Sequence, residues 1–188
     1  MLTERIGQAL ALAVEAHNGQ LRKGTKIPYV SHVMGVASIA LDFGADEDQA
    51  IAALLHDALE DGGPHFAPII AERFGPRVLS IVEGCTDGLP DPTGKKADWH
   101  DRKRAYIAHL FTASDDVLIV SGSDKLHNAR AILSDLQTVG PAVWERFSTK
   151  KEGTLWYYRS LADLFASRGT PMSRQINETV AAIEHLAT

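Results

Sequence analysis

The sequence predicts an all-α protein, and three observations carry this prediction. Apolar residues recur every three or four positions through most of the 188 residues, as they do along one face of a helix. No segment alternates convincingly between apolar and polar residues, except over 117–120, which is too short to decide. Glycine and proline mark the breaks between the helical segments. We therefore expect a bundle of about eight to ten helices, in a single domain over residues 1–188, because chains of this length usually form one domain.

The first half of the chain contains five expected helices, and turn or capping residues bound them. A polar, basic loop over 20–29 separates the first two. Ser31 is a suitable N-cap for the second helix, and Gly44 ends it. Asp46 and Gln49 form a capping-box pattern at the start of the third, and proline can start the fourth and the fifth. These helices are expected over residues 2–17, 32–43, 46–61, 64–74 and 76–85.

The second half begins with a loop over 86–97 that is rich in Asp, Gly and Pro, which are turn residues. A strongly charged helix follows the loop, and a more buried helix comes next. Gly140 and Pro141 then break the chain before three closing helices, which together occupy 141–187. The five helices of this half are expected over residues 98–112, 116–136, 142–147, 152–167 and 171–186.

Composition and charge exclude several classes of protein. With 19 Lys and Arg against 24 Asp and Glu, the net charge is −5, whereas a protein that coats nucleic acid needs a basic surface. No apolar run reaches the ~20 residues that span a bilayer, and the N-terminus has no signal-peptide pattern. The single cysteine, Cys85, excludes an internal disulfide, so we expect a cytoplasmic protein with no nucleic-acid or membrane partner. Any metal in this chain must be held by imidazole and carboxylate rather than by thiolate.

An apolar run over 50–55 leads directly into four ionisable side chains, those of His56, Asp57, Glu60 and Asp61. On an α-helix these four would fall within ~140° of one face. A surface patch at a helix end would also explain them. However, two acids near a helix C-terminus oppose the helix dipole, and a local rule broken without compensation is typical of a functional site. The segment therefore predicts a metal site or an acid–base site.

Two further candidate ligands lie elsewhere in the chain. His32 follows the expected N-cap of the second helix, and Asp124 follows the apolar stretch over 117–120. Taken singly, a His or an Asp in either context is usually structural, so the prediction depends on the whole set. The histidines that show no pattern of partners are expected to be structural or exposed, and these are His17, His65, His100, His109 and His185.

Several motifs combine into one specific pattern. It contains Arg-Lys at 22–23, Pro-Tyr-x-x-His at 28–32, His-Asp-x-x-Glu-Asp at 56–61 and Asp-Lys-Leu-x-Asn at 124–128. A His-Asp pair alone carries no such signal. With the flanking motifs, over about residues 16–130, the sequence resembles the HD-domain metal-dependent phosphohydrolases. It is most similar to the (p)ppGpp hydrolase domain of RelA/SpoT-type stringent-response enzymes, in particular to the stand-alone small alarmone hydrolases.

The resemblance implies a helical HD-domain bundle that holds one divalent metal, typically Mn²⁺ in this family. Two imidazoles and two carboxylates suit such a cation, although ligand type does not separate Mn²⁺ from Fe²⁺, Co²⁺ or Zn²⁺. Glu60 and Asp61 match the family's acidic pair, which orients or deprotonates the attacking water. The implied activity is hydrolysis of the 3′-diphosphate of (p)ppGpp, which gives GDP or GTP and pyrophosphate. The implied metal ligands are His32, His56, Asp57 and Asp124.

The resemblance also implies contacts with the nucleotide. Arg22 and Lys23 match the family's nucleotide-binding Arg-Lys, and Arg is well shaped to stack on a base or to bind a phosphate. Asn128 shares a helix face with Asp124 and matches a nucleotide contact. Lys125 matches the same motif, and a solvated helix charge explains it equally well.

Other expected contacts with the substrate are less specific. The basic run of Arg102, Lys103 and Arg104 resembles the region that contacts the diphosphate, with Arg102 or Lys103 as the expected contact, although a helix surface tied to Asp98 and Asp101 also explains it. In the aromatic run at 156–158, we expect Tyr157 or Tyr158 to touch the substrate, while core packing accounts for the other rings.

The sequence departs from the family pattern in places, and these departures leave alternatives open. Ser123 stands where the family often has Ala, and the loop over 88–96 offers Lys95 and Lys96 as extra phosphate contacts. An adenosine alarmone, the 2′-phosphate of NADPH or a nucleoside phosphate therefore remains an alternative substrate, and a non-catalytic nucleotide sensor is a further alternative. At 188 residues we expect no synthetase domain after the hydrolase.

Overall fold

The structure is a computed structural model that describes residues 1–88 and 97–188. The prediction of an all-α fold is confirmed, because the described residues form nine α-helices and contain no β-strand. A π-helical turn, Ala58–Gly62, follows the third helix, and a 3₁₀ helix, Gly140–Arg146, follows the seventh. The α-helices are α1 (Arg5–Ala16), α2 (Val30–Asp42), α3 (Glu47–Leu55), α4 (Phe66–Phe74), α5 (Pro76–Cys85), α6 (Trp99–Leu110), α7 (Asp115–Val139), α8 (Lys150–Ser167) and α9 (Ser173–Leu186).

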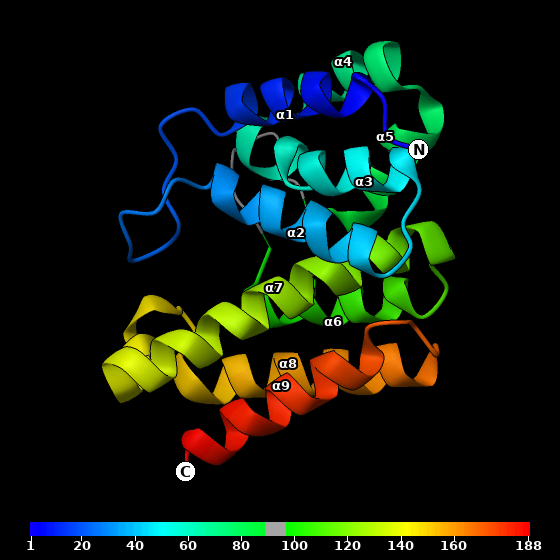
Figure 1. The fold of residues 1–188 in the computed structure, drawn as a ribbon. Coiled ribbons are helices and arrows are strands. Elements are labelled where there is room, and N and C mark those ends of the chain that lie inside the picture. The colour runs from blue at the N-terminus through cyan, green and yellow to red at the C-terminus, as the bar shows by residue number, and fades with distance from the viewer. Residues whose placement is uncertain (89–96) are drawn as a thin grey trace.

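The helices form a stack around α3 and α7. In Figure 1, α1 lies at one end, α2 and α3 follow, α7 crosses the middle, and α8 and α9 close the other end. Helix α3 packs against α1, α2, α5 and α7, which is why its apolar run is buried on every side. The chain that follows α3 therefore starts inside the bundle, where His56 is buried and Asp57 half-buried, and it reaches the surface at Asp61.

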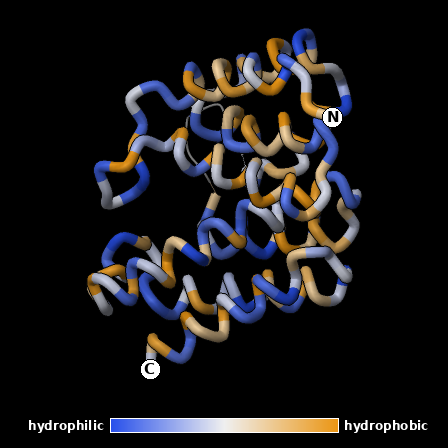
Figure 2. The backbone as a smooth tube through the Cα atoms, viewed as in Figure 1, coloured by the Kyte–Doolittle hydropathy of each residue, from blue (hydrophilic) through white to orange (hydrophobic). Residues whose placement is uncertain are grey.

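Most of the other helices are amphipathic. Figure 2 shows hydrophobic and hydrophilic residues alternating along most of the helical turns. Helix α9 is an example: Ile176, Val180 and Ile183 are buried at helical spacing against α7 and α8, while the residues between them are mostly more exposed. None of the described helices combines the length and the apolar composition that crossing a membrane requires.

The predicted helix starts are confirmed in one case and wrong in another. Asp46 and Gln49 form a reciprocal capping box at α3, with hydrogen bonds of 3.0 and 2.8 Å. Ser31 is not the N-cap of α2, which already begins at Val30, with Tyr29 in the capping position. The reason is that the amides of Ser31 and of the next residue already donate to the carbonyls of the Pro28–Tyr29 turn, so the chain winds before it reaches Ser31.

The prediction of one continuous helix up to Asp61 is also wrong. The α-helix ends at Leu55, a turn follows, and the chain then widens into the π-helical turn Ala58–Gly62. The amide of Gly63 donates to the carbonyl of Ala58 at 3.1 Å, which is an i to i+5 bond. The wider turn changes the angles between the acidic residues, so they do not share the single α-helical face that the sequence predicted.

We expect Cys85 to be unreactive in the folded protein. The residue is only 7% exposed, and burial raises the pKa of its thiol, so the thiolate that attacks disulfide reagents is scarce even at pH 8 or 9. A chromogenic aromatic disulfide should label the native protein at least ~100-fold more slowly than the urea-unfolded protein. Equal labelling rates for the two states would contradict the buried position.

Candidate active site

Three helices that are distant in sequence bring three of the four predicted ligands together. His32 lies in the first turn of α2, His56 directly follows α3, and Asp124 lies in the middle of α7. Their ligand atoms are all within 4.8 Å of one another, and all three residues are buried. The Nε2 atoms of His32 and His56 are 3.1 and 3.6 Å from the same carboxylate oxygen, Oδ1 of Asp124.

Asp57, the fourth predicted ligand, borders this cluster. Its Oδ2 atom is 3.0 Å from Nε2 of His56 and 3.7 Å from Nε2 of His32. The same oxygen accepts a hydrogen bond of 2.6 Å from the hydroxyl of Tyr29. The carboxylate is therefore turned toward both histidines and is held there by a phenol from the start of α2.

The cluster fits a divalent cation. The Nε2 atoms of His32 and His56 are buried and have no hydrogen-bond partner in the described part of the chain. Their Nδ1 atoms are both engaged, that of His56 with the carbonyl of Ala53 at 2.8 Å. Since a buried polar atom without a partner is costly, two such atoms facing two carboxylates indicate a ligand that accepts lone pairs. This is what a metal ion with imidazole and carboxylate ligands provides.

The electrostatics keep the two carboxylates ionised. Burial alone would raise the pKa of Asp124, but Lys125 and the two histidines outweigh it and lower this pKa well below the usual range. Burial would also raise the pKa of Asp57, and the adjacent His56 reverses that effect. Burial lowers the pKa of His32, which favours its neutral form, whereas Asp57 and Asp124 outweigh burial at His56 and raise its pKa. Ionised carboxylates and neutral imidazole are the forms that bind metals.

Lys125 and Asn128 also hold the carboxylate of Asp124. Nζ of Lys125 is 2.5 Å from Oδ2, and the amide nitrogen of Asn128 donates to Oδ1 at 2.6 Å. The side chain of Lys125 is only 13% exposed, so its interpretation as a solvated helix charge is wrong. Asn128 lies four positions after Asp124 on α7 and so shares its face of the helix, whereas Lys125 is the adjacent residue and reaches the carboxylate with its long side chain.

The predicted acidic pair lies on the π-helical turn beside the cluster. Oδ2 of Asp61 accepts a hydrogen bond of 2.8 Å from the amide of Gln20, whose oxygen in turn is 2.8 Å from Nδ1 of His17. His17 is buried, as a structural histidine would be. It begins a series of two hydrogen bonds that passes through Gln20 and ends on Asp61. Glu60 lies near enough to α6 and α8 for its negative charge to raise the pKa of Lys103 and of Tyr157, in addition to the larger effect of burial on each.

Arg102 and Lys103 are both bound to Asp87, a nearly buried carboxylate at the end of α5. Nη1 of Arg102 donates to Oδ1 of Asp87 at 2.6 Å, and Lys103 pairs with the other oxygen. The alternative in which Asp98 and Asp101 hold these two cations is wrong, because Asp101 pairs instead with Arg104 at 3.7 Å. Lys103 also lies over the ring of Tyr157, with Nζ 4.9 Å from the centroid.

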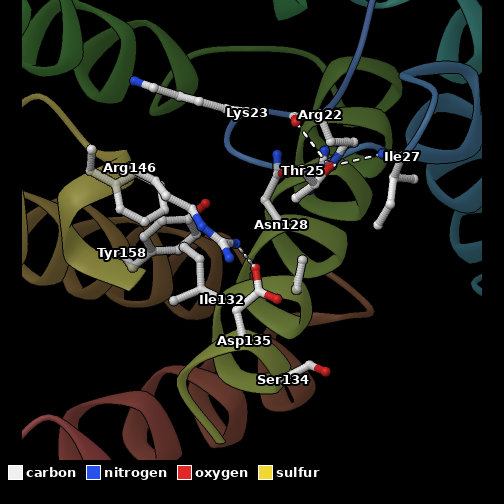
Figure 3. Close-up of a pocket in the computed structure, with 12 residues that line it drawn as sticks. Arg22, Lys23, Thr25, Ile27, Asn128, Ile132, Ser134, Asp135, Arg146 and Tyr158 are labelled. Atoms are coloured by element: carbon white, nitrogen blue, oxygen red, sulfur yellow. Dashed lines mark hydrogen bonds and ion pairs between the residues drawn. The ribbon is translucent and has the colours of Figure 1, made fainter. Parts of the chain in front are cut away.

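A cleft of about 310 Å³ opens beside the cluster, between the 17–29 loop, α7 and the 3₁₀ helix. Figure 3 shows Asn128 reaching into it from α7, with the ring of Tyr158 across from it. Asn128 therefore belongs to both the cluster and the cleft, because its side-chain amide donates to Asp124 and the same side chain lines the cleft. Arg22 and Lys23 line the cleft on the loop side.

Gly24 keeps this loop against the 3₁₀ helix. Its φ angle is +71°, and a Cβ atom there would lie 2.8 Å from Cδ of Arg146. Arg146 forms an ion pair with Asp135 inside the cleft, as Figure 3 shows. The close approach of the loop therefore depends on glycine at this position.

A second cleft of about 160 Å³ adjoins the first and is lined by Lys23, Lys103 and Tyr157. Tyr158 lines both clefts, so both tyrosines of the aromatic run face inward. The hydroxyl of Tyr157 is buried and has no hydrogen-bond partner among the described residues. Trp156 is 36% exposed and packs against Trp99. The predicted contacts Lys95 and Lys96 lie outside the described residues.

Sequence reasoning missed the residues that hold the candidate ligands and acids. Tyr29 and Gln20 lie in the same basic loop as Arg22, but nothing in their spacing pointed to Asp57 or Asp61. The pair of Asp135 and Arg146 was missed because the two residues are eleven positions apart, on α7 and on the 3₁₀ helix. The only signal in the sequence for Tyr29 was its place in the Pro-Tyr-x-x-His motif, three residues before the candidate ligand His32.

Comparisons with known proteins identify the family of this chain. The HD domain family matches residues 9–155. The guanosine-3′,5′-bis(diphosphate) 3′-pyrophosphohydrolase MESH1 of Xenopus tropicalis is 39% identical over 140 residues, which are 73% of this chain and 72% of that protein. The corresponding enzyme of Aquifex aeolicus is also 39% identical, over 69% of this chain, but the match spans only 18% of that longer relative.

Solved structures give the same result. A metazoan ortholog of SpoT, described as hydrolysing ppGpp, has a TM-score of 0.75 and 27% identity, and 94% of each chain is covered. The protein lmo0812 from Listeria monocytogenes has a TM-score of 0.68 at 24% identity and so supports the fold alone. From the family match and the similarity to MESH1, the chain belongs to the HD-domain family, in the branch of the RelA/SpoT-type (p)ppGpp hydrolases.

Proposed function

We propose that this protein is a metal-dependent hydrolase that removes the 3′-diphosphate of (p)ppGpp and releases pyrophosphate. The observation that carries the proposal is the pair of buried, unpartnered Nε2 atoms of His32 and His56 beside two ionised carboxylates. Asn128 connects this centre to a cleft whose loop side carries Arg22 and Lys23. A small polyanion therefore has both a cation and a basic cleft to bind, although the whole chain carries a net charge of −5.

In this proposal His32, His56, Asp57 and Asp124 would hold a divalent cation, which would supply a Lewis acid that lowers the pKa of a water molecule and polarises the phosphoryl oxygen. One carboxylate of the pair Glu60 and Asp61 accepts a proton from the water as the water oxygen bonds to phosphorus. The bond between phosphorus and the ribose 3′-oxygen breaks, and the protonated carboxylate gives its proton to that oxygen, so that one water is consumed and pyrophosphate is released. Arg22 and Lys23 bind the nucleotide at the first cleft. Lys103 and Tyr157 line the second cleft and, together with Arg102, interact with the diphosphate of the nucleotide.

We take Mn²⁺ as the resident cation because of the family resemblance. We take the cytoplasm as the location because the single cysteine is buried and free. The single domain over 1–188 also stays a prediction. The contacts of α9 with α7 and α8 support it, since they join the last helix to the helix that carries Asp124.

The test is a turnover assay on the Mn²⁺-loaded protein with a panel of nucleotides. We expect pyrophosphate and GDP from ppGpp, with ppApp, NADPH and nucleoside triphosphates turned over more slowly. If ppApp, NADPH or a nucleoside triphosphate is turned over faster than ppGpp, that nucleotide is the substrate in place of guanosine alarmones. Tight ppGpp binding with no product under any divalent metal would identify a nucleotide sensor instead.

Gln20 provides a test of the acidic pair, because it donates to Asp61 from outside the metal cluster. We expect Gln20→Ala to lower kcat about tenfold, since a hydrogen bond to a charged group is worth ~1.5–3 kcal/mol and this one is partly exposed to solvent. Gln20→Glu should lower kcat further through repulsion of Asp61. Gln8→Ala, on the exposed side of α1, is the matched control. An unchanged kcat in both Gln20 variants would remove Asp61 from the mechanism.

A further inference from the structure

His127 is the one imidazole in contact with the metal cluster to which neither the sequence motifs nor the proposed mechanism gives a role. It lies on α7, three residues after Asp124, and therefore on the same side of that helix. Its Nδ1 atom is 2.9 Å from Nδ1 of His32, and the two ring centroids are 4.8 Å apart. Helix α7 thus brings a candidate ligand and a partner of another ligand to the same place.

The orientation of His32 decides which of the two Nδ1 atoms donates the hydrogen bond. Nε2 of His32 faces the two carboxylates, at 3.1 and 3.7 Å, and so offers its lone pair to the cluster. A neutral imidazole that ligates through Nε2 carries its proton on Nδ1. His32 is therefore the donor, and Nδ1 of His127 is the acceptor.

The two candidate ligand histidines are oriented in different ways. His56 donates from Nδ1 to the backbone carbonyl of Ala53, which the helix itself provides. His32 has no such carbonyl and depends on a side chain from another helix. Since the second ring nitrogen of a metal-binding histidine almost always has a fixed partner, His127 occupies the place that a carbonyl or a carboxylate usually takes.

Gly35 provides the space for this partner. It lies on α2 three residues after His32, so both face α7 on the same side of the helix. A Cβ atom at position 35 would lie 2.3 Å from Nε2 of His127 and 2.4 Å from its Cδ2 atom. The imidazole ring therefore fills a notch that only glycine leaves open.

We propose that His127 is a positioning residue that accepts the Nδ1 hydrogen of His32 and so keeps Nε2 of His32 turned toward the metal. The proposal rests on the metal site of the proposed function, but not on the identity of the nucleotide. Its direct consequence is on metal affinity, and any effect on turnover follows from that.

A pair of substitutions separates the acceptor from the bulk of the side chain. His127→Leu fills much of the same space without an acceptor, whereas His127→Asn places its Oδ1 atom near the position of Nδ1. We expect His127→Leu to weaken Mn²⁺ binding by ~10–100-fold, which is the usual effect of losing such a partner, and His127→Asn to stay within about threefold of the parent protein. Electron paramagnetic resonance of free Mn²⁺ measures these affinities without any nucleotide, and circular dichroism and thermal unfolding check that each variant is folded.

Gly35→Ala tests the same contact from the other helix. It should weaken Mn²⁺ binding by displacing the ring, and it should add nothing to His127→Ala, where no ring remains to be displaced. Unchanged Mn²⁺ affinity in His127→Leu, or equal losses in the Leu and Asn variants, would overturn the proposal. If the parent protein binds Mn²⁺ but releases no pyrophosphate from ppGpp, the proposed function is overturned. The role of His127 is then still decided by the Mn²⁺ affinities of its variants.

Discussion

Replacement of Asp124 by Asn should abolish metal binding and lower the rate of pyrophosphate release on the order of 10³-fold. The carboxylate of Asp124 lies within 4 Å of both Nε2 atoms, as does that of Asp57, and it also pairs with Lys125. A metal supplies several kcal/mol of transition-state stabilisation, and each 1.4 kcal/mol or so is a factor of about ten in rate. Elemental analysis and the turnover assay measure the two losses together.

The same substitution should lower stability, because it leaves the ammonium group of Lys125 nearly buried and unpaired. Removing one partner of a buried ion pair typically costs ~3–5 kcal/mol. The double variant Asp124→Asn/Lys125→Met removes this charge and should recover much of the thermal stability, but neither the metal nor the activity. Asp163→Asn, at an exposed acid of α8, is the control for both measurements. Retention of metal by the folded Asp124→Asn variant would disprove the assignment of Asp124 as a ligand.

Glu60→Gln should separate chemistry from metal binding. Glu60 lies on the π-helical turn next to Lys103 and Tyr157, and its carboxylate is not among the atoms that form the metal cluster. We expect kcat to fall by ~10²–10⁴-fold, the usual contribution of a general base, while the Mn²⁺ content and the KM for ppGpp change little. Glu178→Gln, an exposed acid of α9, is the matched control.

The outcome of this experiment has two informative exceptions. If the metal is lost together with activity, Glu60 is a ligand rather than a base. If neither changes, the proton of the attacking water goes to Asp61, and the Gln20 variants become the measure of that role. In both cases the roles within the acidic pair are reassigned, while the metal cluster of α2, α3 and α7 is unaffected.

The bundle could be predicted from the sequence because its signals are local. The capping box at Asp46 and Gln49 and the apolar spacing of α9 involve residues within one or two turns of each other, so they are readable without a fold. The ends of elements were less predictable. The π-helical turn after Leu55 is an example, because burial of α3 on every side, rather than local preference, holds the chain there.

The sequence by itself determined the helical class and the set of residues proposed to bind metal and substrate. It did so because acids at a helix end break a local rule and because the flanking motifs are specific. Only the tertiary structure decided which side chains form hydrogen bonds or ion pairs with one another. These partners are Tyr29 and Asp57, Gln20 and Asp61, His127 and His32, and Asp87 with Arg102 and Lys103. These contacts join different segments of the chain, helices as well as the loops and turns between them, and all of them join residues at least fifteen positions apart. Their partners are therefore fixed by how the helices pack, which no spacing along the chain encodes.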